Sequence, residues 1–488
     1  MAKCLAELAV ALDLPAKAGW EKIMISGICE DTQRLESGNL FVAIPGKDRD
    51  GSAFVEMAVK RGAVAILAEH DLSATVPVLI TPYARAALAQ LSAAFYGYPT
   101  HDLFTIGVTG TNGKTTVCHW IAELLGRRLT SLVSTVQNPV LGLPGLTTPP
   151  SPIIQALARD AVGTGAQHFV IEASSAGIAQ ERVGAIEFDA CVFTNLSLEH
   201  VRHHRGLAAY QRAKMKLFED LKPDAWAIVN ADDPLADKMA AATSARVLRY
   251  GCTGKADIQA FDIHLGHRYS QFVVCDRGGA EMRVDVRLPV PGKYNIYNAL
   301  AAISVGIIAG LPLSVIGQRL MQAPPISGRS AYFRREDGLE AVVDFAHNGA
   351  SLEALLSTLR PTASRLIVVF GCPGDGEHEK RASMGAACAQ WADVVVLTSD
   401  NPKHEDPHVI AEDIQAGMVG SQIPVSIIID RTEAIDAAID QAVPGDLLVL
   451  AGKGHEVEQL IGGARLPHSD ADVLRARAFI LEDNASDV

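Results

Sequence analysis

The sequence predicts an α/β protein of three domains, and three observations support this prediction. Its 488 residues are too many for one ordinary hydrophobic core. From about residue 101 onward, short apolar runs alternate with helical segments, which is typical of parallel sheets wound with crossover helices. A glycine-rich loop joins one of these runs to a helix, which indicates a phosphate-binding loop in the central part of the chain.

The predicted strands fall into three groups. The first group precedes an Ala-rich helix over 84–100 that ends in Gly97 and Pro99. Strands are expected at 39–46 and 63–69, then at 103–110, 168–174, 190–196 and 225–231, and then at 366–371, 392–400, 425–430 and 446–452. The expected domains are therefore 1–100, 101–328 and 329–488, of which the last two are doubly wound.

Composition and charge narrow the class of protein. Hydrophobic residues make up 48% of the chain and charged residues 20%, which is typical of a folded protein. The net charge is −13 and no basic tract occurs, so nucleic acid is not an expected partner. No apolar stretch reaches ~18 residues, so no membrane span is expected. The cysteines are scattered and the N-terminus is a poor signal peptide, so we expect a cytoplasmic protein.

The segment Gly-Thr-Asn-Gly-Lys-Thr-Thr carries the clearest chemistry. A turn between a strand and a helix directs backbone N–H groups and the positive helix end toward an anion. Gly113 lets the backbone approach phosphates, Lys114 can reach the β- and γ-phosphates, and the Thr115 hydroxyl can coordinate Mg²⁺. The nucleotide-binding candidates are Gly110, Thr111, Asn112, Gly113, Lys114, Thr115 and Thr116.

This loop departs from the strict phosphate-loop pattern at one place, because Val108 stands at its first glycine. A chance glycine-rich turn is the alternative interpretation. The lysine, the threonine and the strand-to-helix context favour nucleotide binding. The loop by itself indicates only a protein that uses ATP or GTP.

Further segments follow in an order that resembles the Mur ligase family. They are Glu-Ala-Ser-Ser at 172–175, Phe-Thr-Asn-Leu-Ser-Leu-Glu-His at 193–200, Tyr-Gln-Arg-Ala-Lys at 210–214, Asn-Ala-Asp-Asp at 230–233, Gly-Lys-Tyr-Asn-Ile-Tyr-Asn at 292–298 and Asp-Phe-Ala-His at 344–347. The MurE-type branch fits best, on Gly-Arg at 328–329, Asp-Asn-Pro-Lys at 400–403 and Gly-Lys-Gly-His-Glu at 452–456. The similarity covers essentially the whole chain.

The resemblance implies an ATP-dependent ligase that phosphorylates a carboxylate and lets an amine attack the acyl phosphate, leaving ADP and phosphate. It implies an N-terminal domain for a UDP-sugar, a central P-loop ATPase and a C-terminal Rossmann-like domain for the incoming amino acid. MurE-type enzymes act on UDP-N-acetylmuramoyl-L-alanyl-D-glutamate in peptidoglycan precursor synthesis. ATP and Mg²⁺ are the implied cofactors, and we expect a monomer.

The resemblance also assigns roles to single residues. The implied catalytic residues are Lys114, Lys214, His200 and His347, and the implied metal ligands are Thr115, Glu172, His200 and Lys214, the last of these carbamylated. Asn298 and Asp344 would contact adenine and ribose, and Arg329 would lie near the phosphates. Thr32, Thr147, Thr148, Ser174, Gln180 and Arg182 would bind the muramoyl dipeptide, and Asp400, Asn401, Lys403, Gly452 and Glu456 the amino acid.

Without the resemblance, the residues leave alternatives open. His200 is equally well an ordinary surface or core histidine, and Lys214 a solvated helix lysine. Asn298, Asp344, Arg329 and His347 would each be taken as a cap, a turn or a surface pair.

Several positions differ from the family pattern. Gln33, Gly376 and Lys403 stand where the pattern has arginine, Ala176 stands where it has histidine, and His-Ser-Asp-Ala at 468–471 replaces Phe-Asp-Asp-Arg. Replacing arginine by lysine loses a planar fork for a carboxylate, which would weaken capture of the distal carboxylate of diaminopimelate. A MurE-like ligase of specialised metabolism that acts on a different carboxylate therefore stays an alternative.

Two further alternatives are disfavoured by the sequence. A non-catalytic paralogue does not require Lys114, Glu172, His200, Lys214 and Asp344 to be intact, yet all five are present. A folylpolyglutamate synthetase would begin close to its phosphate loop, whereas about a hundred residues precede this one.

Overall fold

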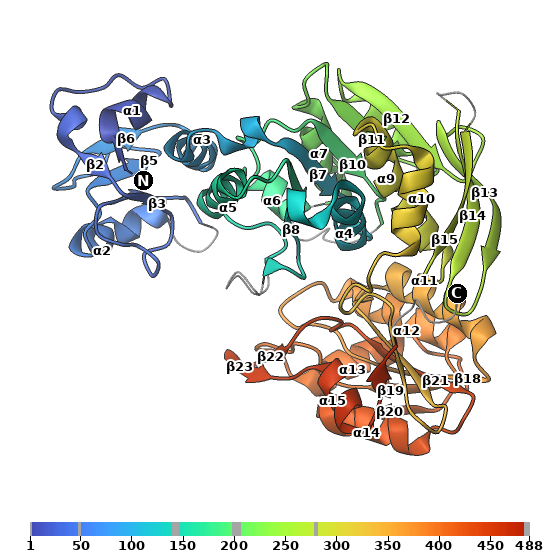
Figure 1. The fold of residues 1–488 in the computed structure, drawn as a ribbon. Helices are drawn as coiled ribbons and strands as arrows, with labels where there is room; N and C mark the ends of the chain where they lie inside the picture. Colours follow the sequence, from blue (N-terminus) through green and yellow to red (C-terminus); the bar gives the residue numbers. More distant parts are fainter. Residues whose placement is uncertain (1, 47–49, 139–145, 198–205, 278–281, 483–488) are drawn as a thin grey trace.

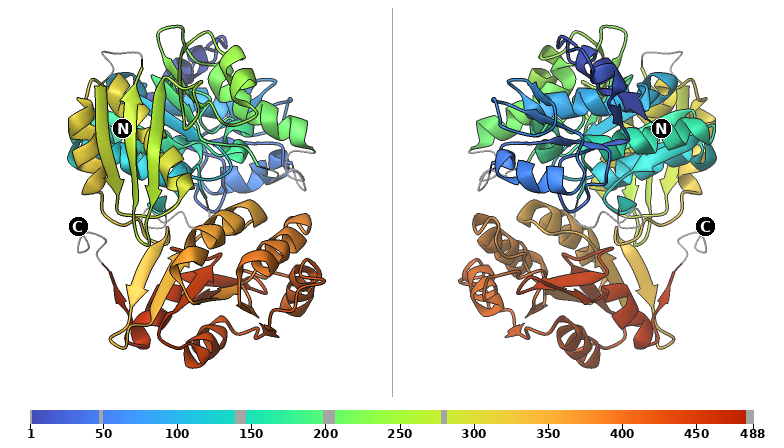
Figure 2. Two further views of the ribbon diagram at one scale, coloured as in Figure 1. Left: turned by 90° about the vertical axis from the view of Figure 1, so that its right-hand side faces the viewer. Right: turned by 90° about the vertical axis from the view of Figure 1, so that its left-hand side faces the viewer.

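The computed structural model describes residues 2–46, 50–138, 146–197, 206–277 and 282–482, and these form three units (Figure 1). The N-terminal unit lies beside the central unit, and the C-terminal unit lies beneath the central one. Figure 2 shows the C-terminal unit as a separate layered body below the rest of the chain. None of the helices in the described ranges combines the length and apolar composition that crossing a bilayer requires.

The N-terminal unit is a four-stranded parallel sheet covered by helices. Its strands pair in the order β3 (Gly27–Cys29), β4 (Asn39–Val42), β5 (Ala65–Ala68) and β6 (Val78–Ile80). It also contains β1 (Lys3–Cys4) paired with β2 (Met24–Ile25), and the helices α1 (Leu5–Val10), α2 (Val55–Lys60) and α3 (Ala84–Tyr96). The expected Ala-rich helix is confirmed as α3, which ends at Gly97 with φ of 76°.

The central unit is built on a nine-stranded sheet with the order β15-β14-β13-β12-β11-β10-β7-β9-β8. Its strands are β7 (Phe104–Thr109), β8 (Thr130–Val133), β9 (His168–Glu172), β10 (Ala190–Phe193), β11 (Trp226–Asn230), β12 (Arg246–Gly251), β13 (Ile258–Leu265), β14 (Ser270–Asp276) and β15 (Met282–Leu288). The strands from β8 to β13 pair in parallel, as the sequence predicts.

The central sheet is parallel except at one edge. Strand β14 pairs antiparallel with both β13 and β15. Short connections between successive strands permit only antiparallel pairing, whereas a parallel pair needs a long crossover. The sequence did not predict the four strands β12 to β15.

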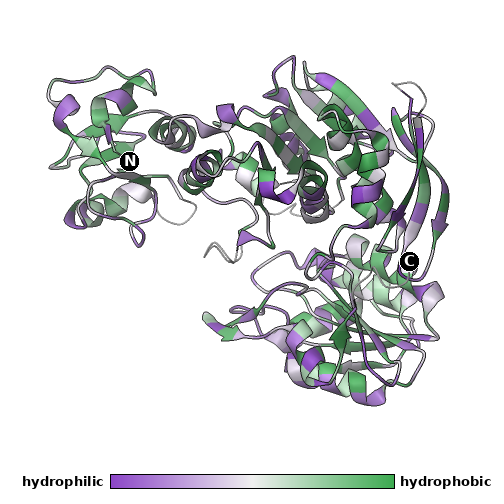
Figure 3. Cartoon of the chain, viewed as in Figure 1, coloured by the Kyte–Doolittle hydropathy of each residue, from purple (hydrophilic) through white to green (hydrophobic). Residues whose placement is uncertain are grey.

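Helices cover both faces of the central sheet. They are α4 (Lys114–Leu125), α5 (Ser151–Gly163), α6 (Ser175–Ala179), α7 (Leu207–Glu219), α8 (Ala236–Ala241), α9 (Lys293–Ile308) and α10 (Leu313–Met321). One apolar cluster joins the sheet to α4, α9 and α10, and a second joins its other face to α5 and α7. Figure 3 shows the hydrophobic colour gathered on these inner strands and helices. The helix that follows β15 is α9, and most of its residues are buried.

The C-terminal unit is a second layered sheet with the strand order β20-β19-β18-β21-β17-β16-β24. Its strands are β16 (Ala331–Arg334), β17 (Glu340–Asp344), β18 (Arg365–Phe370), β19 (Val394–Leu397), β20 (Val425–Ile427), β21 (Asp446–Ala451) and β24 (Ile480–Leu481), and a hairpin pairs β22 (Glu458–Ile461) with β23 (Ala464–Pro467). The helices are α11 (Gly349–Leu359), α12 (Glu379–Trp391), α13 (Pro407–Ala416), α14 (Arg431–Gln441) and α15 (Asp470–Ala476). The predicted doubly wound arrangement is confirmed, with α11 to α13 on one face and α14 and α15 on the other.

Ion pairs also join the central unit to the C-terminal unit. Arg268, between β13 and β14, forms ion pairs with Glu340 and Glu482, the latter at 3.2 Å. The domain boundaries at residues 100 and 328 stay predictions, because the arrangement of the three units does not define the exact residue at which each domain ends.

We predict that Leu300→Ala destabilises the central unit. Leu300 of α9 has no exposed surface, and removing a buried leucine side chain costs about 2–5 kcal/mol. Urea unfolding should show a lower midpoint for this variant. Val10→Ala, at a position that is 63% exposed, is the control and should change the midpoint little. An unchanged midpoint for Leu300→Ala would contradict the packing described for α9.

Candidate active site between the central and C-terminal units

The predicted phosphate loop connects β7 to α4 and is held in one conformation by its own contacts. Lys114 Nζ donates to the carbonyl oxygens of Gly110 at 2.9 Å and Thr111 at 2.8 Å. Gly110 and Gly113 have φ of 151° and 87°, a region that favours glycine. A Cβ atom on Gly113 would overlap Asn298 Oδ1 of α9. The loop therefore brings its backbone next to a residue predicted to contact adenine.

A second loop, which follows β10, supports the phosphate loop. Thr111 N donates to Asn195 O at 2.9 Å, and Asn112 N donates to Asn195 Oδ1 at 3.0 Å. Thr194 Oγ1 donates to Asn112 O at 2.7 Å, and the Thr111 hydroxyl lies 3.0 Å from Tyr210 OH. We assigned no role to Asn195 or Tyr210 from the sequence, although both lie in segments that carry the family resemblance.

Glu172 lies at the end of β9 and is 1% exposed. Its two carboxylate oxygens accept hydrogen bonds from Thr135 N at 2.8 Å and Thr135 Oγ1 at 3.1 Å, and Thr135 Oγ1 lies 3.3 Å from Thr147 Oγ1. Arg329 Nη2 donates to Thr115 Oγ1 at 3.0 Å, and its charge acts on Glu172. Thr115 and Glu172 thus present oxygen atoms of the kind that Mg²⁺ prefers. No sequence signal identified Thr135.

Of the two other predicted metal ligands, the structure describes Lys214 but not His200. Lys214 lies on α7, is 1% exposed, and has its Nζ 4.7 Å from the centre of the Tyr210 ring. It is therefore a buried residue near the phosphate loop, and the solvated helix lysine considered above is excluded. His200 lies outside the described residues, so its predicted role is untested. Within the described ranges, no group of three or more His, Cys, Asp or Glu residues could hold a metal ion.

A cleft of about 420 Å³ opens between the central unit and the C-terminal unit. The central unit lines it with Asn112, Gly113 and Thr116 of the loop region and with Asn295 and Asn298 of α9. Arg329, Asp344 and His347 line it from the C-terminal side. The structure therefore brings together most of the residues predicted to bind nucleotide.

Asp344 ends β17 and anchors the C-terminal wall of this cleft. Its Oδ2 accepts from Ser330 N at 2.6 Å, and its Oδ1 accepts from Ala346 N at 2.8 Å. Burial raises the pKa of Asp344, while the nearby Arg329 charge opposes that rise. His347 Nδ1 lies 2.9 Å from Phe345 O, which fixes its ring at the cleft wall.

The residues predicted to bind the muramoyl dipeptide form one cluster beside Glu172. Thr148 Oγ1 donates to Glu172 O at 2.7 Å and lies 2.9 Å from Ser174 Oγ. Arg182 donates to Thr148 O and, through Nη2, to Gln180 Oε1 at 2.7 Å. Five of the six predicted residues, counting Thr147, therefore come together in the central unit.

The sixth predicted residue, Thr32, belongs to the N-terminal unit. Its carbonyl oxygen accepts from Arg61, and the structure shows no direct contact between Thr32 and the cluster in the residues that it describes. The neighbouring Glu30 interacts by charge with Arg182 and Arg85, although burial is what chiefly raises its pKa. The charge interaction between Glu30 and Arg182 therefore indicates that the loop carrying Thr32 lies near the cluster.

The residues predicted to bind the amino acid converge in the C-terminal unit. Asn401 Nδ2 donates to Glu456 Oε2 at 2.9 Å, and Lys453 Nζ donates to the same oxygen at 2.7 Å and to Asn401 Oδ1 at 3.2 Å. Asp400 is 2% exposed, and a Cβ atom on Gly452 would lie 2.7 Å from Asp400 Oδ2. The fully buried Lys453 was not predicted, although it lies within the segment 452–456.

Lys403 is fixed chiefly by its main chain. Its N–H donates to Leu460 O at 2.9 Å, its carbonyl oxygen accepts from Gly462 N at 2.6 Å, and its φ is 53°. These contacts attach the loop after β19 to the β22–β23 hairpin. The structure does not place the Lys403 side chain among the contacts that join Asn401 to Glu456.

His455 lies beside the backbone of Thr135 in the central unit, close enough for that backbone to act on the pKa of its imidazole. Burial and the Arg329 charge lower the pKa of His455 to about 3, so its imidazole is neutral at physiological pH. The His455 and Phe345 ring centres are 5.1 Å apart. Because Thr135 holds Glu172, the loop 452–456 lies beside the residue that supports the predicted metal ligand.

The fold and this arrangement define a ligase of three units, in which the predicted phosphate loop faces the C-terminal unit. Family models match 24–96 as the Mur ligase family catalytic domain, 108–306 as the Mur ligase middle domain and 328–454 as the Mur ligase glutamate ligase domain. The chain belongs to the Mur ligase family, whose members are ATP-dependent amide ligases, and it is an enzyme of that kind.

The similarity to known proteins extends over nearly the whole chain. The UDP-N-acetylmuramoyl-L-alanyl-D-glutamate–2,6-diaminopimelate ligase of Geobacillus thermodenitrificans is 38% identical, over 91% of this chain and 93% of that protein. A solved structure of an enzyme with the same name is 30% identical, covers 98% of both chains and has a TM-score of 0.66. MurF from Acinetobacter baumannii, 20% identical with a TM-score of 0.68 over 92% of this chain and 95% of that one, shares the fold.

We predict that Gly113→Ala abolishes ATP binding, measured by titration calorimetry. The new methyl group would overlap Asn298 Oδ1, and the residue would have to keep a φ of 87°. Gly126→Ala is the matched control, because Gly126 follows the other end of α4 with a φ of 91° and open space around it. ATP binding by Gly113→Ala at the affinity of the control would contradict the proposed position of the nucleotide.

Proposed function

We propose that this enzyme joins an amino acid to UDP-N-acetylmuramoyl-L-alanyl-D-glutamate, using ATP, in the synthesis of a peptidoglycan precursor. The names and the extent of similarity of the relatives support this substrate. Their names also make 2,6-diaminopimelate the first amino acid to test.

The position of Thr135 is the observation that carries the proposal. Thr135 bonds Glu172, which lies in the group predicted to bind metal, and it contacts Thr147 of the dipeptide cluster. Its backbone also lies close enough to His455, one residue from Glu456 of the amino-acid group, to act on the pKa of the His455 imidazole. An amide ligase needs its phosphate donor, its carboxylate and its amine at one point, and these three groups meet at this residue.

The first chemical step in this proposal is phosphoryl transfer. A carboxylate oxygen of the dipeptide attacks the γ-phosphorus of ATP, the bond to the β,γ-bridging oxygen breaks, and ADP leaves. The backbone N–H groups of the phosphate loop and the charge of Lys114 would hold the phosphates. Arg329, which bonds Thr115 from the opposite unit, would add a second positive charge at the cleft.

Thr115 and Glu172 fit a site for Mg²⁺, because both present oxygen atoms at the ends of neighbouring elements. Carbamylated Lys214 and His200 would complete the ligand set in this proposal. Bound there, Mg²⁺ would reduce the repulsion between the two anionic substrates. Thr135 would keep the Glu172 carboxylate oriented.

The second step is attack by the amine of the incoming amino acid on the acyl phosphate. A tetrahedral intermediate forms, phosphate leaves, and the nitrogen gives up a proton as the amide bond is made. Asp400 and Glu456 would bind the ammonium group before it loses its proton. Lys453 and Asn401 hold Glu456 in place from behind.

We predict that phosphate release requires the UDP-linked dipeptide, ATP, Mg²⁺ and one amino acid. The test incubates purified enzyme with the first three and a panel of single amino acids that includes diaminopimelate, and measures phosphate and product mass. A product heavier by one amino-acid residue is expected. Binding of ATP without turnover across the panel would reject this substrate and favour a different carboxylate.

We also predict that Lys214→Ala is inactive and is partly restored by short carboxylic acids, because a free carboxylate can replace a carbamate as a metal ligand. ADP formation with and without added acetate or propionate measures this. Lys216→Ala, two residues along α7 in a partly buried pair with Glu181, is the control and should stay active. Full activity of Lys214→Ala without added acid would refute the carbamate.

A further inference from the structure

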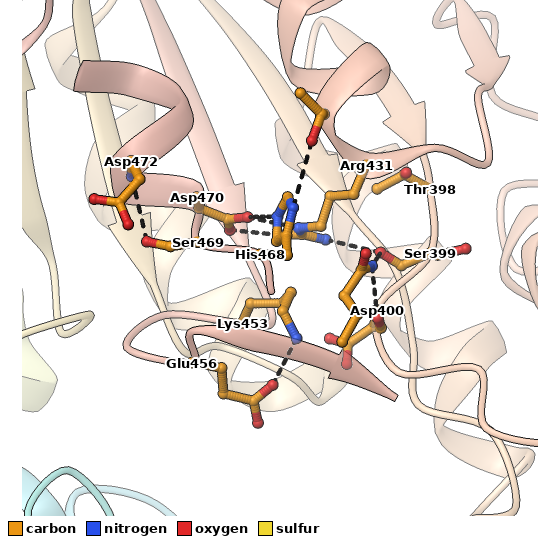
Figure 4. Close-up of polar contacts among 12 residues, drawn as sticks. Thr398, Ser399, Asp400, Arg431, Lys453, Glu456, His468, Ser469, Asp470 and Asp472 are labelled. Carbon is orange, nitrogen blue, oxygen red and sulfur yellow. Dashed lines mark hydrogen bonds and ion pairs between the residues drawn. The ribbon is translucent and has the colours of Figure 1, made fainter. Parts of the chain in front are cut away.

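A buried charged cluster lies behind the amino-acid group and has no role in the function proposed so far (Figure 4). Arg431 is the first residue of α14, and its side chain and that of Asp470 are both fully buried. Arg431 Nε donates to Asp470 Oδ1 at 2.7 Å, and Nη2 donates to Asp470 Oδ2 at 2.7 Å. His468 Nε2 lies 2.9 Å from Asp470 Oδ1. These contacts fix the plane of the guanidinium.

The same guanidinium also bonds two main-chain carbonyl groups. Arg431 Nη2 donates to Ala451 O at 2.9 Å, and Nη1 is 3.4 Å from Ser399 O. Ala451 ends β21 and immediately precedes Gly452, and Ser399 immediately precedes Asp400. One side chain therefore joins the two loops that carry the predicted amino-acid ligands.

These two loops approach each other with little free space. A Cβ atom on Gly452 would lie 2.7 Å from Asp400 Oδ2, and Gln459 Nε2 donates to Asp400 O at 2.9 Å. Asp400 Oδ2 is buried and accepts no hydrogen bond from the described residues. A small change in the distance between the loops would therefore move Asp400 Oδ2, which accepts no hydrogen bond from the described residues.

The charge of Arg431 also acts on the amino-acid group. Burial lowers the pKa of Arg431, but Asp470, and after it Asp400 and Glu456, raise it more, so the guanidinium stays charged. Its charge offsets the repulsion between Asp400 and Glu456. A lysine ammonium could keep the charge, but it lacks the planar fork that reaches a carboxylate and two carbonyl groups together.

We propose that Arg431 is a positioning residue for the incoming amino acid, and that its guanidinium sets the separation between the loop 399–401 and the loop 451–456. Asp470 and His468 hold the guanidinium in place. This inference rests on the proposed function, because the role of the two loops in binding the amino acid is part of that function.

The test compares Arg431→Lys with the wild-type enzyme in the phosphate-release assay. We expect KM for the amino acid to rise about tenfold or more, because a displacement near 1 Å can cost about a hundredfold in rate. KM for ATP and for the UDP-linked dipeptide should stay within about twofold, because those substrates contact other loops. An unchanged amino-acid KM in the folded variant would overturn the inference.

Arg365→Lys is the matched control. Arg365 pairs with Asp446 through Nη2 at 2.6 Å, and Asp446 begins the strand β21 whose other end Arg431 holds. Weakening this pair should lower the thermal midpoint and leave the amino-acid KM unchanged. A KM increase in Arg365→Lys as large as that in Arg431→Lys would show a general effect of strand stability and would also overturn the inference.

A double variant covers the case in which Arg431→Lys does not fold. Replacing Arg431 by Met and Asp470 by Asn removes both buried charges, which is often neutral or stabilising for a buried ion pair. A raised amino-acid KM in this variant supports positioning, and a wild-type KM overturns it. Wild-type enzyme that uses no amino acid with the UDP-linked dipeptide would overturn the proposed function and this inference together, before any variant is compared.

Discussion

The hydrogen bonds from Thr135 to the buried Glu172 carboxylate are the interaction on which the site depends. A buried carboxylate without partners would be costly, and two donors from one residue reduce that cost while fixing its orientation. The same residue contacts Thr147 and lies beside His455, so the dipeptide cluster and the loop 452–456 are placed near Glu172. The distances between the three proposed substrate sites therefore follow from one local arrangement.

The two sheets explain why these residues can meet. In parallel sheets, the carboxyl ends of the strands lie at one edge, where binding loops gather. The phosphate loop follows β7, Glu172 ends β9, and Thr194 follows β10, and these three strands are neighbours. In the C-terminal unit, Asp344 ends β17 and Gly452 follows β21. The carboxyl ends of the two sheets thus supply the two walls of one cleft.

Buried ion pairs hold the C-terminal half of the site, although such pairs are weak evidence for stability. Arg431 with Asp470 and Lys453 with Glu456 lie directly behind or within the amino-acid group. Hydrophobic residues of the same volume would fill the space equally well, but they could not hold carbonyl oxygens and carboxylates at defined positions. These ion pairs are therefore better explained by the need to position the loops than by a contribution to the free energy of folding.

The sequence by itself determined the fold class, the strand and helix alternation, the phosphate loop and the family, because local periodicity and short motifs carry that information. The residues that it could not identify are Thr135, Lys453, His455 and Arg431 as parts of one site. Their contacts join segments far apart in the chain, and the antiparallel strands β13 to β15 likewise depended on pairing between segments. Only the tertiary structure decided these features, because a hydrogen bond between distant residues depends on how the sheets bring their loops together.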